Sequence, residues 1–147
     1  MKAIYFDMDG TIADFYGVPH WLDYLKDNDP FPYVTAQPLV NMSLLARLLN
    51  CLQAKGWHIG IVSWLSKSGT ADFNEVAKLE KLKWLDKHLH SVKWNEIAII
   101  PYGTPKQEVA QYATEGILFD DEIPNRENWA GTAYDAGNII EILKGLN

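Results

Sequence analysis

The first segment of the chain, residues 2–7 (KAIYFD), is almost continuously apolar. A strand with one solvated face alternates apolar and polar residues, whereas a strand covered on both faces of a parallel sheet does not. The segment therefore predicts a strand buried between two layers of helices. Parallel strands also need long crossover connections, usually helices, so the rest of the chain must supply them.

The following sequence supplies these connections. Apolar residues recur at helical spacing from Leu39 to Leu52 and stop before Gly56, a residue suited to a helix C-terminus. Further strands are predicted at 58–64, 96–100, 116–121 and 132–136, and further helices at 70–89, 105–113 and 138–146. This alternation predicts an α/β fold: a doubly wound, Rossmann-like parallel sheet in three layers. A length of 147 residues suits a single domain, 1–147.

One stretch departs from this alternation. Residues 12–37 are rich in aromatic residues and prolines and are too irregular for a long helix, although Pro19 could start a short one. The stretch predicts a very small cap insertion after the first strand, which would act as a lid.

Bulk properties exclude several classes of partner. The formal net charge is −6 and no run of lysines and arginines offers a footprint for polymeric nucleic acid. No apolar run approaches the roughly 18 residues of a membrane span, and the first residues lack a signal-peptide pattern. The single cysteine, Cys51, lies in an apolar helical pattern, so we expect a buried thiol and a cytoplasmic protein. Nothing in the sequence indicates an oligomeric state.

Two carboxylates end the first strand. Asp7 and Asp9 are spaced two apart, so their side chains would face one pocket if the strand continues. Like charges this close need a bound cation or a raised pKa on one carboxyl group. A bound cation or a raised carboxyl pKa is typical of a functional site.

Other polar residues follow the later strands. Ser63 ends the second strand, Asp120 and Asp121 end another, and Lys106 begins the helix after residues 96–100. The carboxyl ends of parallel strands meet at one edge, where ligands bind in such sheets. Carboxylates beside a lysine and a hydroxyl suit Mg²⁺ and a phosphate group. An aspartate can attack phosphorus while a second one protonates the leaving alcohol.

In combination, these residues resemble the haloacid dehalogenase-like (HAD) superfamily of phosphohydrolases. The DMDGT segment at Asp7 is similar to the first motif of the family, Ser63 to the second, Lys106 to the third and Asp120-Asp121 to the fourth. The order along the chain also matches. The resemblance implies a Mg²⁺-dependent phosphatase that hydrolyses a small phosphomonoester through an aspartyl-phosphate.

The resemblance also implies a role for each matching residue. Asp7 would be the nucleophile and a metal ligand, and Asp9 the general acid and base, with its backbone carbonyl on the metal. Ser63 and Lys106 would bind phosphate, and Asp121 would bind the metal with support from Asp120. Gly10 and Thr11 would shape the turn, and their backbone N–H groups would face the phosphate.

The lid suggests a substrate class. Its aromatic residues could stack on a planar base, although they could equally pack the lid against the domain. Tyr16, His20 and Trp21 in the lid, and Trp64 after Ser63, are candidates for substrate contact. The segments KLKWLDKHL, FDDEIPNRENW and GTAYDAG are similar to the 5'(3')-deoxyribonucleotidase branch, which implies a nucleoside monophosphate as substrate.

Three alternatives remain open at this point. The substrate could be a sugar phosphate or a larger phosphorylated partner. The chain could be a receiver-like phosphorylation domain, but a receiver has its acidic pair first and its accepting aspartate mid-chain, whereas Asp120 and Asp121 come last here. It could also be a non-catalytic phosphate-binding domain, which the presence of every motif position disfavours.

Overall fold

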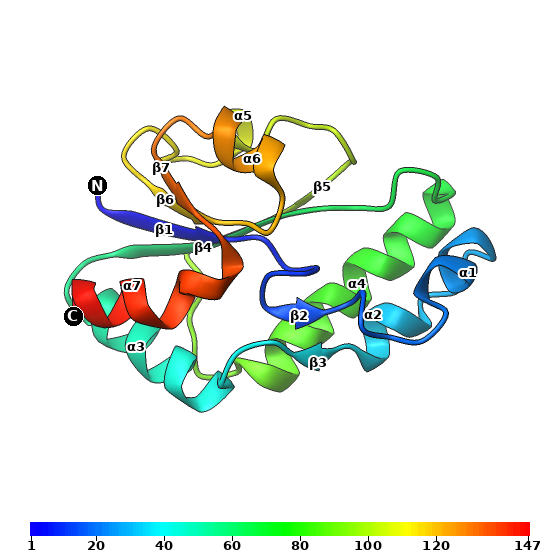
Figure 1. The fold of residues 1–147 in the computed structure, drawn as a ribbon, viewed down its shortest axis with the longest axis horizontal. Helices are drawn as coiled ribbons and strands as arrows, with labels where there is room; N and C mark the ends of the chain where they lie inside the picture. Colours follow the sequence, from blue (N-terminus) through cyan, green and yellow to red (C-terminus); the bar gives the residue numbers. More distant parts are fainter.

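The computed structural model describes residues 1–147 and contains a five-stranded parallel sheet (Figure 1). Its strands are β1 (Ala3–Phe6), β4 (His58–Trp64), β5 (Glu96–Ile100), β6 (Ile117–Phe119) and β7 (Thr132–Tyr134). Their order across the sheet is β5-β4-β1-β6-β7, so β1 is central. The chain winds outward from β1 through β4 to β5 and then crosses to β6 and β7. This order confirms the predicted doubly wound, Rossmann-like fold.

Helices cover both faces of the sheet. They are α3 (Met42–Ala54), α4 (Ala71–His88), α5 (Lys106–Val109), α6 (Ile123–Asn128) and α7 (Ile139–Leu146), the last preceded by a 3-10 turn, η1 (Ala136–Asn138). Figure 1 shows α3 and α7 on one side of the sheet and α5 and α6 on the other. The side chains of Asn41 and Thr70 accept hydrogen bonds from backbone N–H groups in the first turns of α3 and α4, which fixes where these helices begin.

The two faces of β1 belong to different parts of the core. Ile4 and Phe6 pack in the larger cluster, with α3, α7 and the C-terminal half of α4. Tyr5 points the other way and packs with Trp129 and Ala110. All four residues of β1 are fully buried, as expected for a strand between two helical layers.

The insertion after β1 forms a small layer of its own. It contains α1 (Trp21–Lys26), α2 (Phe31–Thr35) and an antiparallel pairing of β2 (Ala13–Asp14) with β3 (Gln37–Pro38), which brings its two ends together. Phe15 and Tyr33 are buried against Phe73 and Ala77 of α4. Figure 1 shows α1 and α2 beside α4, away from the other helices. Some lid aromatics therefore serve to pack the insertion onto α4.

The helix predicted at 105–113 is shorter than expected. Only Lys106–Val109 is helical, and Ala110 has an extended backbone (ψ 123°). The following N–H groups find partners outside a helix: that of Gln111 donates to the Glu96 carboxylate (3.0 Å) and that of Tyr112 to the Tyr5 hydroxyl (3.0 Å). Tertiary hydrogen bonds have replaced helical ones here.

The prediction of a buried Cys51 is wrong, because its side chain is exposed. The buried stripe of α3 consists of Leu45, Leu49 and Leu52, and Cys51 lies beside this stripe.

No helix in the structure is both long enough and apolar enough to cross a membrane.

The close packing of the connection before β7 gives a prediction for stability. A Cβ atom on Gly131 would lie 2.2 Å from the Gly116 carbonyl oxygen, whereas one on Gly137 would meet no atom within 4 Å. We expect Gly131→Ala to lower the free energy of unfolding by about 1–3 kcal/mol, because the backbone must shift to relieve the overlap. Gly137→Ala is the matched control. Urea unfolding of both variants checks this, and equal midpoints would contradict the close contact.

Candidate active site

Asp7 lies at the carboxyl edge of the sheet, directly after β1. Its backbone N–H donates to the Phe119 carbonyl oxygen (3.0 Å), which continues the pairing of β1 with β6 by one step. Its carboxylate is held from two directions: Lys106 Nζ lies 3.0 Å from Oδ1, and the Thr11 hydroxyl donates to Oδ2 at 3.1 Å. The side chain is only 10% exposed. Asp7 therefore has a fixed orientation at the predicted ligand-binding edge.

A tight loop follows Asp7. The backbone N–H groups of Thr11, Ile12 and Ala13 all donate to the Met8 carbonyl oxygen, at 3.0 to 3.1 Å. Gly10 has φ of 82°, in the left-handed region, and a Cβ atom there would lie 2.4 Å from Asp121 Oδ2. Glycine is thus required both for the turn and to leave room for the Asp121 carboxylate.

This loop corrects one prediction. The N–H of Gly10 donates to the Ala13 carbonyl (2.8 Å) and that of Thr11 to Met8, so neither is free to bind a phosphate group. The N–H groups of Met8 and Asp9 donate no hydrogen bond within the chain and are the available donors of the loop. The Thr11 hydroxyl instead links carboxylates, because it contacts both Asp7 and Asp121.

The acidic pair follows β6, the neighbour of β1. Asp120 is fully buried and all its partners are within the chain: Lys106 Nζ (2.7 Å), the Asn125 amide (3.2 Å) and the Glu122 backbone N–H (2.9 Å). Asp121 is less enclosed; its Oδ1 atom lies 3.2 Å from the Thr11 hydroxyl oxygen, which accepts a hydrogen bond from the Asp121 backbone N–H (3.2 Å). Asp120 thus orients Lys106, while Asp121 keeps an oxygen without a partner.

Three carboxylates gather closely enough to share a cation. One oxygen each from Asp7, Asp120 and Asp121 lies within 4.8 Å of the others. An all-oxygen set of carboxylates suits a hard divalent cation such as Mg²⁺. The Asp9 side chain is not part of this cluster, so Asp9 could contribute to a metal only through its backbone carbonyl, as the resemblance implies.

Burial raises the pKa values of the acidic groups. Desolvation, reinforced by the charge of Asp7, raises the pKa of Asp120 to about 6 and that of Asp121 to about 7. Burial also raises the pKa of Asp9, and the nearby Lys81 ammonium partly opposes this shift. Burial would lower the pKa of Lys106, but the carboxylates of Asp7 and Asp120 outweigh it, and the pKa is raised. Lys106 is therefore charged, while Asp121, with a pKa of about 7, can hold a proton near neutral pH.

Sequence reasoning missed Lys81, which is 1% exposed and lies 3.0 Å from Asp9 Oδ2. Its ammonium group also donates to the hydroxyl of Ser63 (2.9 Å). Ser63 itself is buried at the end of β4 and does not line the cavity described below. One signal was present in the sequence: Lys81 shares a helical face with Ala77 and Trp84, which are both buried.

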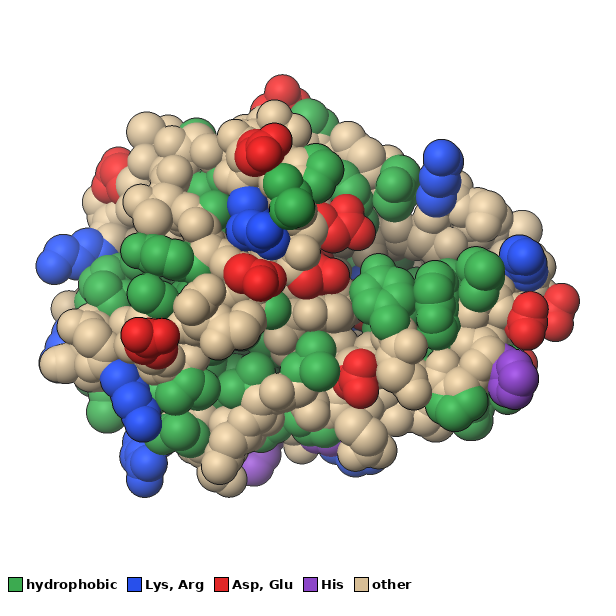
Figure 2. All heavy atoms as spheres, viewed as in Figure 1, with side chains coloured by type: hydrophobic (Ala, Val, Ile, Leu, Met, Phe, Trp, Pro, Cys, Tyr) green, Lys and Arg blue, Asp and Glu red, His purple; other side chains and the backbone are tan.

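A cavity of about 250 Å³ opens above the carboxylates. Its walls include Tyr16 and Trp21 from the insertion and Trp64 from the end of β4, and its floor includes Asp7, Asp9 and Lys106. Figure 2 shows acidic side chains gathered near the middle of this face, next to a hollow bordered by apolar side chains. Three of the four residues predicted to contact substrate thus line one cavity.

His20 is the exception among these four residues. Its side chain is 78% exposed, lies near Asp23 (3.7 Å) and does not line the cavity. Its left-handed backbone (φ 64°) immediately precedes α1. The structure therefore gives no support to substrate contact by His20.

Two solved structures have an overall fold similar to that of this chain. No family model and no curated protein matches the sequence. A structure of a Pnkp1/Rnl/Hen1 complex matches over 92% of this chain with 18% identity and a TM-score of 0.59, and the match spans 45% of that chain, less than half its length. The D,D-heptose 1,7-bisphosphate phosphatase of Burkholderia thailandensis matches over 86% of this chain and 70% of its own, with 12% identity and a TM-score of 0.53. At these identities the similarity shows that this chain shares its overall fold with both structures.

Proposed function

We propose that this protein is a Mg²⁺-dependent phosphatase that hydrolyses a small phosphomonoester through an aspartyl-phosphate. The observation that carries the proposal is the placement of Asp7: a buried, oriented carboxylate at the floor of a cavity, beside two more carboxylates and a buried lysine. The similarity to a phosphatase of HAD-like fold supports it. Such a site has the parts that phosphoryl transfer requires.

Asp7, Asp9 and Lys106 each have a different role in the proposed reaction. Asp7 attacks phosphorus, and Asp9 gives its proton to the leaving oxygen as the phosphorus–oxygen bond breaks. Asp9 then takes a proton from the water that attacks the aspartyl-phosphate, which releases inorganic phosphate and restores Asp7. Lys106 neutralises charge on the phosphoryl oxygens. The raised pKa of Asp9 supports its role as a proton donor.

The metal site would consist of the carboxylates of Asp7 and Asp121 and the backbone carbonyl of Asp9. Asp120 would support the site by orienting Lys106. A bound Mg²⁺ supplies positive charge that balances the phosphoryl group and its acidic surroundings. The oxygen of Asp121 without a partner supports its role as a ligand.

For the substrate, we propose a nucleoside monophosphate, with a deoxynucleotide preferred. Tyr16, Trp21 and Trp64 give the cavity aromatic walls above the phosphate site, and such walls suit a planar base. The volume lies below the range of about 300–1,000 Å³ typical of sites for drug-sized ligands, which favours a small substrate. A sugar phosphate is the other candidate, and the heptose phosphatase among the similar structures supports it.

The metal proposal predicts a stability effect. Mg²⁺ should raise the melting temperature of the wild-type protein at pH 8. The corresponding gain in the free energy of unfolding is about 2.7 kcal/mol when the Mg²⁺ concentration is about 100 times its dissociation constant. The gain should shrink as the pH falls below 7, because protons compete for Asp121 with its raised pKa of about 7. Asp121→Asn should lose the gain, whereas Glu127→Gln, an exposed position on α6, should keep it. An equal gain in both variants would place the metal elsewhere.

The nucleophile proposal predicts the loss of turnover in Asp7→Asn. The amide keeps the size of the carboxylate but cannot form the acyl phosphate, so phosphate release should fall by at least about 1,000-fold. The assay compares nucleoside monophosphates, sugar phosphates and an aryl phosphate, each with Mg²⁺ and with a chelator. Asp86→Asn, at an exposed position of α4, is the matched control. Retained turnover in Asp7→Asn would show that Asp7 is not the nucleophile.

The substrate proposal predicts a selective effect of Trp21→Ala. Loss of stacking on a base costs about 1–3 kcal/mol, so kcat/KM for deoxynucleoside monophosphates should fall by about tenfold, while that for glycerol phosphate should change little. Phe31→Ala removes an exposed aromatic of the same insertion that does not line the cavity, and serves as control. Equal losses on both substrates would exclude base recognition by this wall.

A further inference from the structure

Lys81 is a second buried ammonium group at the site, and the mechanism above does not use it. It comes from the middle of α4, and its Nζ atom lies 3.0 Å from Asp9 Oδ2, 2.9 Å from Ser63 Oγ and 2.7 Å from the Trp64 carbonyl oxygen. An ammonium group has three protons, so these three contacts use its whole capacity. Lys81 is thus fixed in place.

Stability alone does not account for a lysine at this position. Its neighbours on the buried face of α4 are Phe73, Ala77, Trp84 and Leu85, all apolar or aromatic. A buried ion pair costs desolvation of both charges, and an apolar side chain of similar volume is often as stabilising or more so. The other lysines of α4 show the contrast: Lys83, two residues further on, has a side chain that is 71% exposed.

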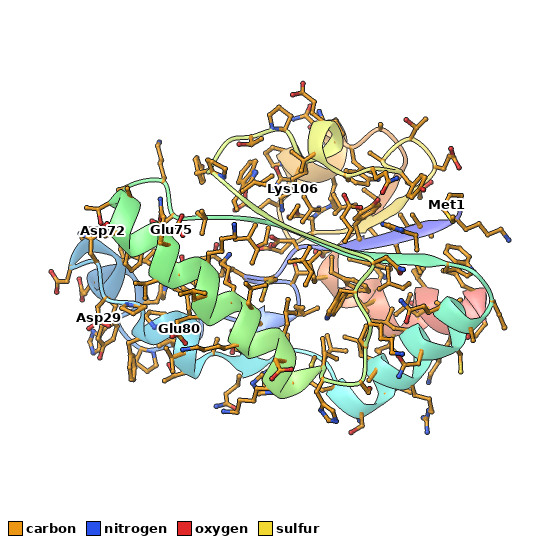
Figure 3. All side chains as sticks on the ribbon, turned by 180° about the vertical axis from the view of Figure 1, so that it is seen from behind. Met1, Asp29, Asp72, Glu75, Glu80 and Lys106 are labelled. Atoms are coloured by element: carbon orange, nitrogen blue, oxygen red, sulfur yellow. The ribbon has the colours of Figure 1, made fainter.

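The two buried lysines serve different carboxylates. Lys106 holds Asp7 and Asp120 from α5, which lies over the face of the sheet that Tyr5 points to. Lys81 holds Asp9 from α4, whose C-terminal half packs on the opposite face. Figure 3 shows Lys106, at the start of α5, and Glu80, the residue before Lys81, midway along α4. Each proposed catalytic carboxylate therefore has its own cation.

Lys81 also joins parts of the site that would otherwise be independent. Its contacts with Ser63 and Trp64 anchor it to the end of β4, and the ring of Tyr33 from the insertion lies 5.4 Å from Nζ. The Asp9 side chain is 19% exposed and lies in the loop after β1, so the strand itself does not fix its rotamer. The contact with Lys81 is the only ion pair of this carboxylate in the structure.

We propose that Lys81 is a positioning residue that holds the Asp9 carboxyl group in the orientation from which it exchanges a proton with the leaving oxygen. The proposal rests on the phosphatase function proposed above. Lys81 itself neither gives nor takes the proton: Asp9 gives it to the oxygen as the phosphorus–oxygen bond breaks. Removal of Lys81 frees the Asp9 side chain to turn, so proton transfer slows while attack by Asp7 continues.

The leaving group of the substrate tests this role. p-Nitrophenolate departs without protonation, whereas the alkoxide of glycerol phosphate needs a proton from Asp9. Single-turnover measurements of the released alcohol report this cleavage step alone. For Lys81→Met we expect a loss of about 100-fold on glycerol phosphate and less than about fivefold on p-nitrophenyl phosphate. Asp9→Asn should show the same pattern, and Lys83→Met should match the wild type on both substrates.

The ratio of the two rates makes the test robust to folding. Partial unfolding lowers both rates equally and leaves their ratio unchanged. Lys81→Arg, which keeps a buried donor for Asp9, should return the ratio toward the wild-type value. If Lys81→Met does not fold, Lys81→Gln takes its place in the same comparison of the two substrates.

Equal losses of Lys81→Met on the two substrates would overturn the positioning role and leave a structural one. Loss on p-nitrophenyl phosphate alone would also overturn it. Failure of the wild-type protein to hydrolyse these two esters and also nucleoside monophosphates and sugar phosphates in the presence of Mg²⁺ would instead overturn the proposed function, so the two failures are distinguishable.

Discussion

Repulsion among carboxylates is the constraint on which the rest of this site depends. Asp7, Asp9, Asp120 and Asp121 converge at one edge of the sheet, and two buried lysines offset part of their charge. If all four are ionised, two negative charges remain, which matches a divalent cation. Burial raises the pKa values of Asp120 and Asp121, and the negative charge of Asp7 raises them further. A proton and a bound divalent cation would therefore compete for the same carboxylate oxygens.

The sheet makes this convergence possible. β1 and β6 are neighbours although more than a hundred residues separate them, and the hydrogen bond from Asp7 to Phe119 keeps their ends in register. Asp7 and Asp120 each follow the last residue of their strand, so backbone pairing fixes both positions before any side chain acts. Hydrophobic burial of β1 on both faces therefore supplies the rigidity that holds like charges together.

Sequence reasoning succeeded where one local pattern decides the outcome. The buried strands, the order of the helices and the strand-end residues Asp7, Asp120 and Asp121 follow from short patterns read in order. It failed where distant partners decide. The N–H groups of Gly10 and Thr11 turn inward to the loop, and Cys51 lies beside the buried stripe of its helix. Lys81 was missed because a lysine on a charged helix is usually solvated, and its partners come from other elements.

The small insertion combines two physical roles that are usually separate. Phe15 and Tyr33 pack it onto α4, whereas Tyr16 and Trp21 line the cavity. Because Tyr33 also contacts Lys81, the packing of the insertion and the orientation of Asp9 share one helix. An insertion of this size buries too little surface to be stable as a separate domain. Its position on α4 therefore links the wall of the cavity directly to Lys81 and Asp9.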